Sequence, residues 1–256
     1  MQLGVGSCLF LLSHLLAVSG FLLGTTSRHV PRGGLRVQNK NSAMKAATAT
    51  TSSELIELAR KFVDEESGFY SPSSPDRLAE DFIFRGPVIG PLTKTDYLST
   101  METFKVYKAF PDISANTFGF TVDPKNDRRV WFFVRNTGIN TGQFGLPFGA
   151  SISPTGKEVE GPIEAFSVLF DEENRVKYLS VGYVCDRFEG NTGGQGAAFG
   201  LLRVMEVPLP RVTSWLYRAV VFFSNRILNS PAKSCSKASD LPEWWTHPER
   251  GPDGYV

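Results

Sequence analysis

Residues 157–188 read KEVEGPIEAFSVLFDEENRVKYLSVGYVCDRF, and the rest of the chain is arranged around them. Two strand-like runs flank residues 171–174, whose sequence DEEN is typical of a turn. Apolar residues occur at both odd and even positions of the second run, so we expect both of its faces to be covered, as in a central strand. Asp186 follows where the apolar residues end. The pattern predicts a central β-hairpin with a carboxylate at one end.

Helices are predicted before the hairpin. Thr51 and Glu54 are spaced as a capping box, in which each side chain accepts a hydrogen bond from the other residue's backbone N–H. Apolar residues at helical spacing follow and predict a helix to about residue 66. A second helix is predicted behind residues 93–96, TKTD, and a strand, DFIFR, lies between the two helices at residues 81–85.

Strand patterns dominate the next part of the chain. Residues 113–122 and 129–140 are each predicted to form a strand, with the turn sequence DPKND between them. Helices followed by a meander of strands is the order of an α+β fold, with helices on one face of the sheet. We predict a cone-shaped, curved antiparallel sheet wrapped by N-terminal helices, followed by a C-terminal helical extension.

The charge distribution argues against a nucleic-acid-binding protein. Five basic residues and no acidic residue precede Glu54, whereas 22 basic residues face 26 acidic ones from there onward. Proteins that bind nucleic acids usually carry the opposite charge. His247 is the only histidine beyond residue 53, and Cys185 and Cys235 belong to no CxxC pair. We therefore predict no metal site and no cofactor.

The first 52 residues are predicted to be a two-part leader. Residues 3–23 are an apolar run with small residues at 17–20, which predicts a signal peptide over 1–20. Residues 21–52 are rich in Ser, Thr and Ala and carry basic but no acidic residues, as in a transit peptide. With Phe21 at the junction, the leader resembles that of plastid proteins in algae with complex plastids. We expect delivery to the plastid (chloroplast) through the secretory pathway; a secreted protein is the alternative.

Four segments suggest a family: ELIELARKFVDEE (54–66), LAEDFIFRGPVIG (78–90), TKTDYLSTMETF (93–104) and VKYLSVGYVCDRF (176–188). With them, residues 53–190 resemble the nuclear transport factor 2-like superfamily, in particular its SnoaL-like domains. The resemblance implies an α+β barrel around an apolar pocket that binds, and as an enzyme isomerises or cyclises, a small hydrophobic molecule. The superfamily also contains pure binding modules. A non-catalytic binding or scaffold module of a plastid protein complex is therefore the alternative.

The resemblance also suggests a catalytic residue. In SnoaL-like cyclases an acid on the last strand faces the pocket and moves a proton, and Asp186 resembles that acid in the context GYVCDRF. A carboxylate at the edge of an apolar cavity would have a raised pKa and could exchange protons near neutral pH. The alternative is that Asp186 pairs with an arginine or caps the loop that follows.

Other residues on the predicted core elements are candidates for lining the pocket or binding substrate. An arginine could bind an anionic substrate or an enolate oxygen, but a shift of one residue in strand register would turn it to solvent. For the tryptophan, a place in the core is the alternative. These candidates are Arg85, Tyr97, Trp131, Arg135, Glu164 and Tyr183.

Residues 191–256 extend beyond the family pattern. The glycines of residues 189–200 lack the spacing of a phosphate-binding loop and predict a turn or lid over the barrel mouth. Residues 210–229 are predicted to form a helix that packs on protein or in a homodimer, with peripheral contact to a membrane surface as the alternative. Trp244 and Trp245 are expected to clamp the tail onto the domain.

Overall fold

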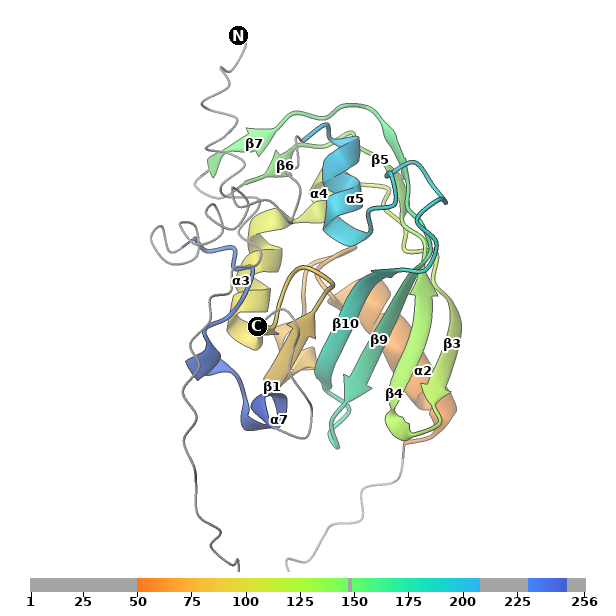
Figure 1. Cartoon of the computed structure of the whole chain (residues 1–256), viewed down its shortest axis with the longest axis vertical. Helices are drawn as coiled ribbons and strands as arrows, with labels where there is room; N and C mark the ends of the chain where they lie inside the picture. Colours follow the sequence, from red (N-terminus) through yellow and green to blue (C-terminus); the bar gives the residue numbers. More distant parts are fainter. Residues whose placement is uncertain (1–49, 147–148, 208–229, 248–256) are drawn as a thin grey trace, which may run out of the picture.

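A curved six-stranded sheet, in the order β2-β1-β10-β9-β4-β3, organises the computed structural model (Figure 1). The structure describes residues 50–146, 149–207 and 230–247. The predicted signal peptide, most of the transit-peptide-like segment and the predicted helix at 210–229 lie outside these residues. The strands of the sheet are β1 (Leu78–Arg85), β2 (Leu92–Thr93), β3 (Phe118–Asp123), β4 (Asn126–Val134), β9 (Glu164–Phe170) and β10 (Val176–Val184).

The predicted hairpin is confirmed as the centre of the sheet. β10 pairs antiparallel with β9 on one side and parallel with β1 on the other. The pairs β9–β4, β4–β3 and β1–β2 are antiparallel. Asp171 closes the turn, because its Oδ1 accepts hydrogen bonds from the backbone N–H groups of Glu173 and Arg175. The α+β class and the curved sheet are as predicted, with one parallel pair inside an otherwise antiparallel sheet.

Helix α2 (Ser52–Lys61) covers one face of the sheet (Figure 1). Its capping box is confirmed: Thr51 N–H donates to Glu54 Oε2 over 2.7 Å, and Glu54 N–H donates to Thr51 Oγ1 over 3.3 Å. The helix runs on as a π-helical turn, η1 (Phe62–Glu66), and a 3-10 turn, η2 (Pro75–Arg77), leads into β1. The start of α2 is therefore set by a local pair of hydrogen bonds that the sequence predicts.

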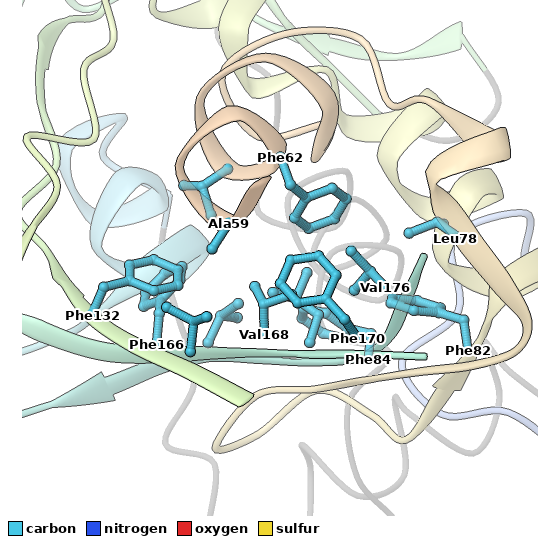
Figure 2. Packing of buried hydrophobic residues seen from close by; sticks show 14 of the residues in the cluster. Ala59, Phe62, Leu78, Phe82, Phe84, Phe132, Phe166, Val168, Phe170 and Val176 are labelled. Atoms are coloured by element: carbon cyan, nitrogen blue, oxygen red, sulfur yellow. The ribbon is translucent and has the colours of Figure 1, made fainter. Parts of the chain in front are cut away.

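The main core lies between α2 and the sheet. Figure 2 shows Ala59 of α2 and Phe62 of η1 above the apolar side chains of β1, β4, β9 and β10. Phe62 is fully buried, and Phe132 of β4 stacks on Phe120 with 4.7 Å between ring centroids. The buried residues on the facing strands include Phe82, Phe84, Val130, Phe132, Phe166, Val168, Phe170, Val176, Leu179 and Val181.

The side chains of β10 do not alternate strictly between the two faces of the sheet. Register shifts interrupt its pairing with β9 between Val176 and Tyr178 and again between Ser180 and Tyr183. A bulge of this kind adds a residue on one strand and changes which face the following side chains take. Val176, Leu179 and Val181 therefore all belong to the core, whereas Tyr183 is exposed.

A second layer of short elements closes the end of the sheet where β10 finishes (Figure 1). Helix α3 (Lys94–Phe104) runs beside β1 and leads into this layer (Figure 1). The layer contains α4 (Val106–Ala109) and α5 (Ala197–Val204), with the two-stranded sheets β5–β8 and β6–β7. The short strands are β5 (Thr137–Ile139), β6 (Phe144–Gly145), β7 (Ser151–Ile152) and β8 (Glu158–Glu160). Their apolar side chains form a second buried cluster that includes Phe110, Phe144, Leu201 and Met205. The predicted second helix is confirmed as α3.

The C-terminal tail packs back onto the domain. It contains η5 (Ala238–Asp240) and α7 (Glu243–Thr246), which lies beside β1 in Figure 1. Trp244 Nε1 donates to the carbonyl of Asp81 over 3.0 Å, and Trp245 is buried with its ring 5.5 Å from that of Tyr178. The predicted tryptophan clamp is confirmed.

Candidate functional site

A cavity of about 350 Å³ lies between α3, the last residues of β10, α5 and residues 232–234 of the tail. Its walls are mainly apolar. The lining side chains from the helices and strands include Phe84, Leu92, Met101, Phe104, Phe144, Val181, Val184, Ala198, Phe199, Leu201, Leu202 and Met205. Helix α5, which forms one wall of the cavity, belongs to the glycine-rich segment that the sequence predicts to turn over the barrel mouth.

Two glycines bring α5 close to the sheet. Gly182 has a φ of +80°, and a Cβ there would lie 3.3 Å from both Ala197 Cβ and Pro87 Cδ. A Cβ on Gly196 would lie 2.8 Å from Val184 Cγ2 and 2.9 Å from Glu164 Oε2. A side chain at Gly196 would therefore require Val184, Glu164 or the start of α5 to move. Both glycines line the cavity.

We call Gly182 and Gly196 the glycine wall of the cavity. Glu164, the first residue of β9, lies directly behind it. Its side chain is buried, with 1% of the residue exposed, and both carboxylate oxygens accept from Ala197 N–H over 2.9 Å. Ala197 is the first residue of α5, and its N-cap, Gly196, makes no side-chain capping bond. A carboxylate from the sheet thus takes the place that a capping side chain has in other helices.

A short polar chain continues from Glu164 into the core. Asn136 Nδ2 donates to Glu164 Oε1 over 3.3 Å, and Tyr70 Oη donates to Asn136 Oδ1 over 2.6 Å. A small void of about 20 Å³ borders Tyr70, Asn136 and Ala197. Three polar side chains from three segments are therefore linked behind the cavity, in surroundings that are otherwise apolar.

Burial dominates the titration of this cluster. It raises the pKa of Glu164 to about 7, and the hydrogen bonds from Ala197 and Asn136 offset only part of the effect. Burial, followed by the charge of Glu164, also raises the pKa of Tyr70 well above its usual value. Tyr70 therefore stays a neutral donor, while Glu164 changes its protonation state near neutral pH.

Few polar groups line the cavity itself. Among the described residues, the polar ones that line it are Thr100, Lys105, Gln195, Lys233 and Ser234. Within the described residues, Gln195 Oε1 is buried and accepts no hydrogen bond.

Asp186 does not face the cavity, and the prediction of its position is wrong. β10 ends at Val184, so Asp186 lies in the exposed turn that follows, and its Oδ1 accepts from Phe188 N–H over 2.9 Å. The alternative interpretation, a cap on the next loop, describes its contacts. Because Asp186 lies outside the cavity, we do not propose it as a catalytic residue.

The buried candidates have structural partners. Arg85 Nη1 donates to the carbonyls of Gly86 over 2.7 Å and Ile89 over 3.1 Å, which holds the loop after β1. Tyr97 is fully buried and donates to the carbonyl of Ser67, and burial raises its pKa. Neither side chain lines the cavity.

The remaining candidates lie away from the cavity. Trp131 is 36% exposed, and its Nε1 donates to Asp123 Oδ2 over 2.9 Å. Tyr183 is exposed. Arg135 pairs with Glu189 over 2.6 Å and with Glu160 over 3.8 Å. Of the predicted set, Glu164 alone reaches the glycine wall of the cavity.

Two negative findings apply to the described part of the chain. None of its helices combines the length and apolar character needed to cross a bilayer. No cluster of three His, Cys, Asp or Glu side chains suited to a metal ion occurs in residues 50–146, 149–207 and 230–247.

Comparisons with known proteins give structural similarity at low identity. No family model and no curated protein matches the chain. A candidate SnoaL-like polyketide cyclase from Jannaschia sp. CCS1 is 13% identical with a TM-score of 0.40, covering 67% of this chain and 99% of that one. AclR, a candidate hydroxylase from Streptomyces galilaeus, is 17% identical with a TM-score of 0.42, covering 70% and 97%. An NTF2-like protein from Anabaena variabilis ATCC 29413 is 16% identical with a TM-score of 0.39, covering 56% and 97%. At these values the similarities assign neither an activity nor a ligand to this chain.

Proposed function

We propose that this domain binds a small, predominantly apolar molecule in the cavity between α3, β10 and α5. The observation that carries the proposal is the cavity itself: about 350 Å³ with mainly apolar walls and a few polar groups. Small-molecule sites have volumes of roughly 300–1,000 Å³ and the same composition, because apolar walls supply affinity and single polar groups fix orientation. Thr100, Gln195 and Ser234 are the uncharged polar residues that line it among the described residues, and we assign the orienting role to them.

Binding is tested with N-phenyl-1-naphthylamine, a neutral dye whose fluorescence rises in apolar surroundings. We expect the protein to enhance the dye's fluorescence saturably. Ala198→Trp places a large side chain on the cavity wall and should weaken binding at least about tenfold, equivalent to about 1.4 kcal/mol. Ala238→Trp is the matched control, because Ala238 is exposed in the tail and should leave binding unchanged. Equal binding by both variants, or no saturable binding by the parent protein, would refute the proposal.

A second candidate function is cofactor-independent isomerisation or cyclisation, and Glu164 is the observation that favours it. A carboxyl group with a pKa of about 7 can both give and accept a proton near neutral pH. Its two oxygens are bonded to Ala197 N–H, so the start of α5 must release them before Glu164 can reach a ligand. A binding module without turnover is the alternative and needs the cavity alone.

Proton transfer is tested with 2-decanone in D₂O, by following deuterium uptake next to the carbonyl with mass spectrometry. If Glu164 moves protons, the parent protein accelerates exchange, and Glu164→Gln lowers the rate by about 10²–10⁴-fold. The dye titration shows separately whether the variant retains its cavity. If the parent protein and Glu164→Gln exchange deuterium at the same rate, proton transfer by Glu164 is excluded and the proposed function is binding without turnover.

We also propose that residues 1–52 deliver the domain to a plastid through the secretory pathway. The support is the apolar run followed by a basic, acid-free segment with Phe21 between them. Residues 1–53 fused to a fluorescent reporter should reach the plastid, and Phe21→Ala should hold the reporter in the secretory route. Release of the intact reporter into the medium would favour a secreted protein.

A further inference from the structure

Helix α5 is held differently at its two ends. At its C-terminal end, the carbonyl of Val204 accepts a hydrogen bond from Thr155 Oγ1 over 3.3 Å. The residues that line the cavity there are buried: Leu201, Leu202 and Met205. The residues that line the cavity at the start of the helix are only partly buried: Ala197, Ala198 and Phe199. The start of α5 is therefore the end that can leave the sheet with the smaller loss of apolar contact.

The backbone at the start of α5 is strained. Ala197 has a φ of +44°, a left-handed conformation that residues with a Cβ rarely adopt and that persists only where its surroundings hold it. Gly193 and Gly194, shortly before it, have φ values of +66° and +75°, which glycine adopts without this cost. Both carboxylate oxygens of Glu164 accept from Ala197 N–H and hold it in place. Without this contact Ala197 could relax, with the chain turning at the two glycines.

From these features we infer that α5 is a movable wall of the cavity and that Glu164 is the latch that holds it closed. This inference rests on the proposed binding function and describes how entry to the same site is regulated. In the closed state Glu164 is buried beneath the first turn of α5. In the open state the first turn has left the sheet, a ligand can enter or leave, and water reaches the carboxylate.

The latch depends on pH, because closing α5 removes Glu164 from water. Burial raises the pKa of Glu164 to about 7 in the closed state, and contact with water returns it to about 4.5. The protonated acid therefore favours the closed state, and the open fraction rises with pH between these two values. While the open state remains a minor one, the two pKa values give a rise of about tenfold in the open fraction from pH 6 to pH 8.

Other titratable or charged groups occur on the elements around Glu164. Tyr70 faces it through Asn136, and burial raises the pKa of Tyr70 well above its usual value, so it stays neutral. The others are Asp64 in η1, whose charge acts on Tyr70, Arg135 after β4, which pairs with Glu160 and Glu189, Arg203 in the last turn of α5, and the exposed Asp186 after β10. Glu164→Gln leaves all of these groups in place, so it isolates the contribution of Glu164.

The first test measures how fast N-phenyl-1-naphthylamine, uncharged over this range, binds and dissociates at pH 6, 7 and 8 in a stopped-flow instrument. We expect both rate constants of the parent protein to rise about tenfold from pH 6 to pH 8. The dissociation constant should change by less than about twofold, because the free and the bound protein are both mainly closed. In Glu164→Gln the rates should not depend on pH. Glu158→Gln, at an exposed position of the neighbouring strand β8, is the control and should behave as the parent does.

The second test follows amide hydrogen exchange of the full chain without a ligand. After correction for the intrinsic effect of pH on exchange, protection at the start of α5 should fall about tenfold from pH 6 to pH 8 in the parent protein and stay constant in Glu164→Gln. Protection in β1 should stay constant in both. An equal loss in β1 would mean that the whole domain opens, and the latch would be wrong.

The two tests separate the latch from the binding function. If the dye binds saturably at rates that do not change with pH, the latch is wrong and the binding function stands. A pH dependence that survives in Glu164→Gln would also refute the latch. If the dye does not bind, the proposed function fails, and exchange at the start of α5 still decides whether Glu164 controls its movement.

Discussion

Replacing Glu164 with glutamine should change how the stability of the domain depends on pH. Glutamine has nearly the same shape and can still accept a hydrogen bond from Ala197 N–H, but it cannot be ionised. In the folded protein the pKa of Glu164 is raised from 4.5 to about 7, chiefly by burial. The folded state therefore holds a proton that the unfolded chain releases more easily.

The sign and size follow from this difference. Below a pH of about 4.5 the group is protonated in both states and the pKa difference has no effect. Between about 4.5 and 7 the unfolded state loses the proton first, so the free energy of unfolding falls by about 1.4 kcal/mol per pH unit. Over the whole interval the loss is about 3 kcal/mol, and above about pH 7 it stays constant. Glu164→Gln should remove it.

Urea denaturation of the parent and the variant at pH 4 to 8 measures this effect. The difference in the free energy of unfolding, variant minus parent, should grow by about 3 kcal/mol from the acidic to the basic end of the series. Glu57→Gln, at an exposed position of α2, is the control for the loss of one carboxylate. Parallel curves for the parent and Glu164→Gln would refute the assignment of a buried, proton-binding Glu164.

Three further predictions concern stability at one pH, measured by urea denaturation. Thr51→Ala removes the capping box and should lower the free energy of unfolding by about 1 kcal/mol. An unchanged urea midpoint would show that α2 does not need its cap. Trp245→Ala removes the buried ring that packs on Tyr178 and should lower the free energy of unfolding by roughly 3–5 kcal/mol. Trp131→Ala, at a partly exposed position, should lower it much less, and equal losses in the two variants would contradict the tryptophan clamp. Tyr70→Phe leaves Asn136 Oδ1 without its donor and should cost about 1–3 kcal/mol, whereas a neutral result would mean that another donor replaces the tyrosine.

The sequence predicts elements better than side-chain directions. Capping residues and apolar spacing are local, so the start of α2, the helix α3 and the β9–β10 hairpin are found where these patterns place them. The register shifts in β10 are set by packing between distant segments and have no local signal. The end of β10 at Val184 has no local signal either, and it leaves Asp186 in an exposed turn.

The candidate site depends even more on long-range packing. Glu164 is named from the sequence, but its partners Asn136 and Ala197 are 28 and 33 residues away along the chain. The tail contributes to the cavity only because it packs back against α3, where Lys233 N–H donates to Thr100 Oγ1. The sequence offers one signal: Glu164 is a charged residue at the start of a strand, two and four residues before the apolar Phe166 and Val168. A carboxylate on the same strand face as buried apolar residues lies either at the solvent-exposed end of the strand or at a buried functional site.

The parallel pairing of β1 with β10 has a consequence for how the chain folds during synthesis. Ile83 lies opposite Tyr178, so 95 residues separate two neighbours at the centre of the sheet. During synthesis from the N-terminus, α2 and β1 leave the ribosome early. Strand β1 cannot pair with β10 until the hairpin of β9 and β10 has also left the ribosome. Pairings across such separations are slow, because a long loop must close before any contact rewards it. The early half of the domain therefore exposes Phe82 and Phe84 until late in translation, and a nascent chain of this connectivity is a natural client for chaperones that shield apolar segments.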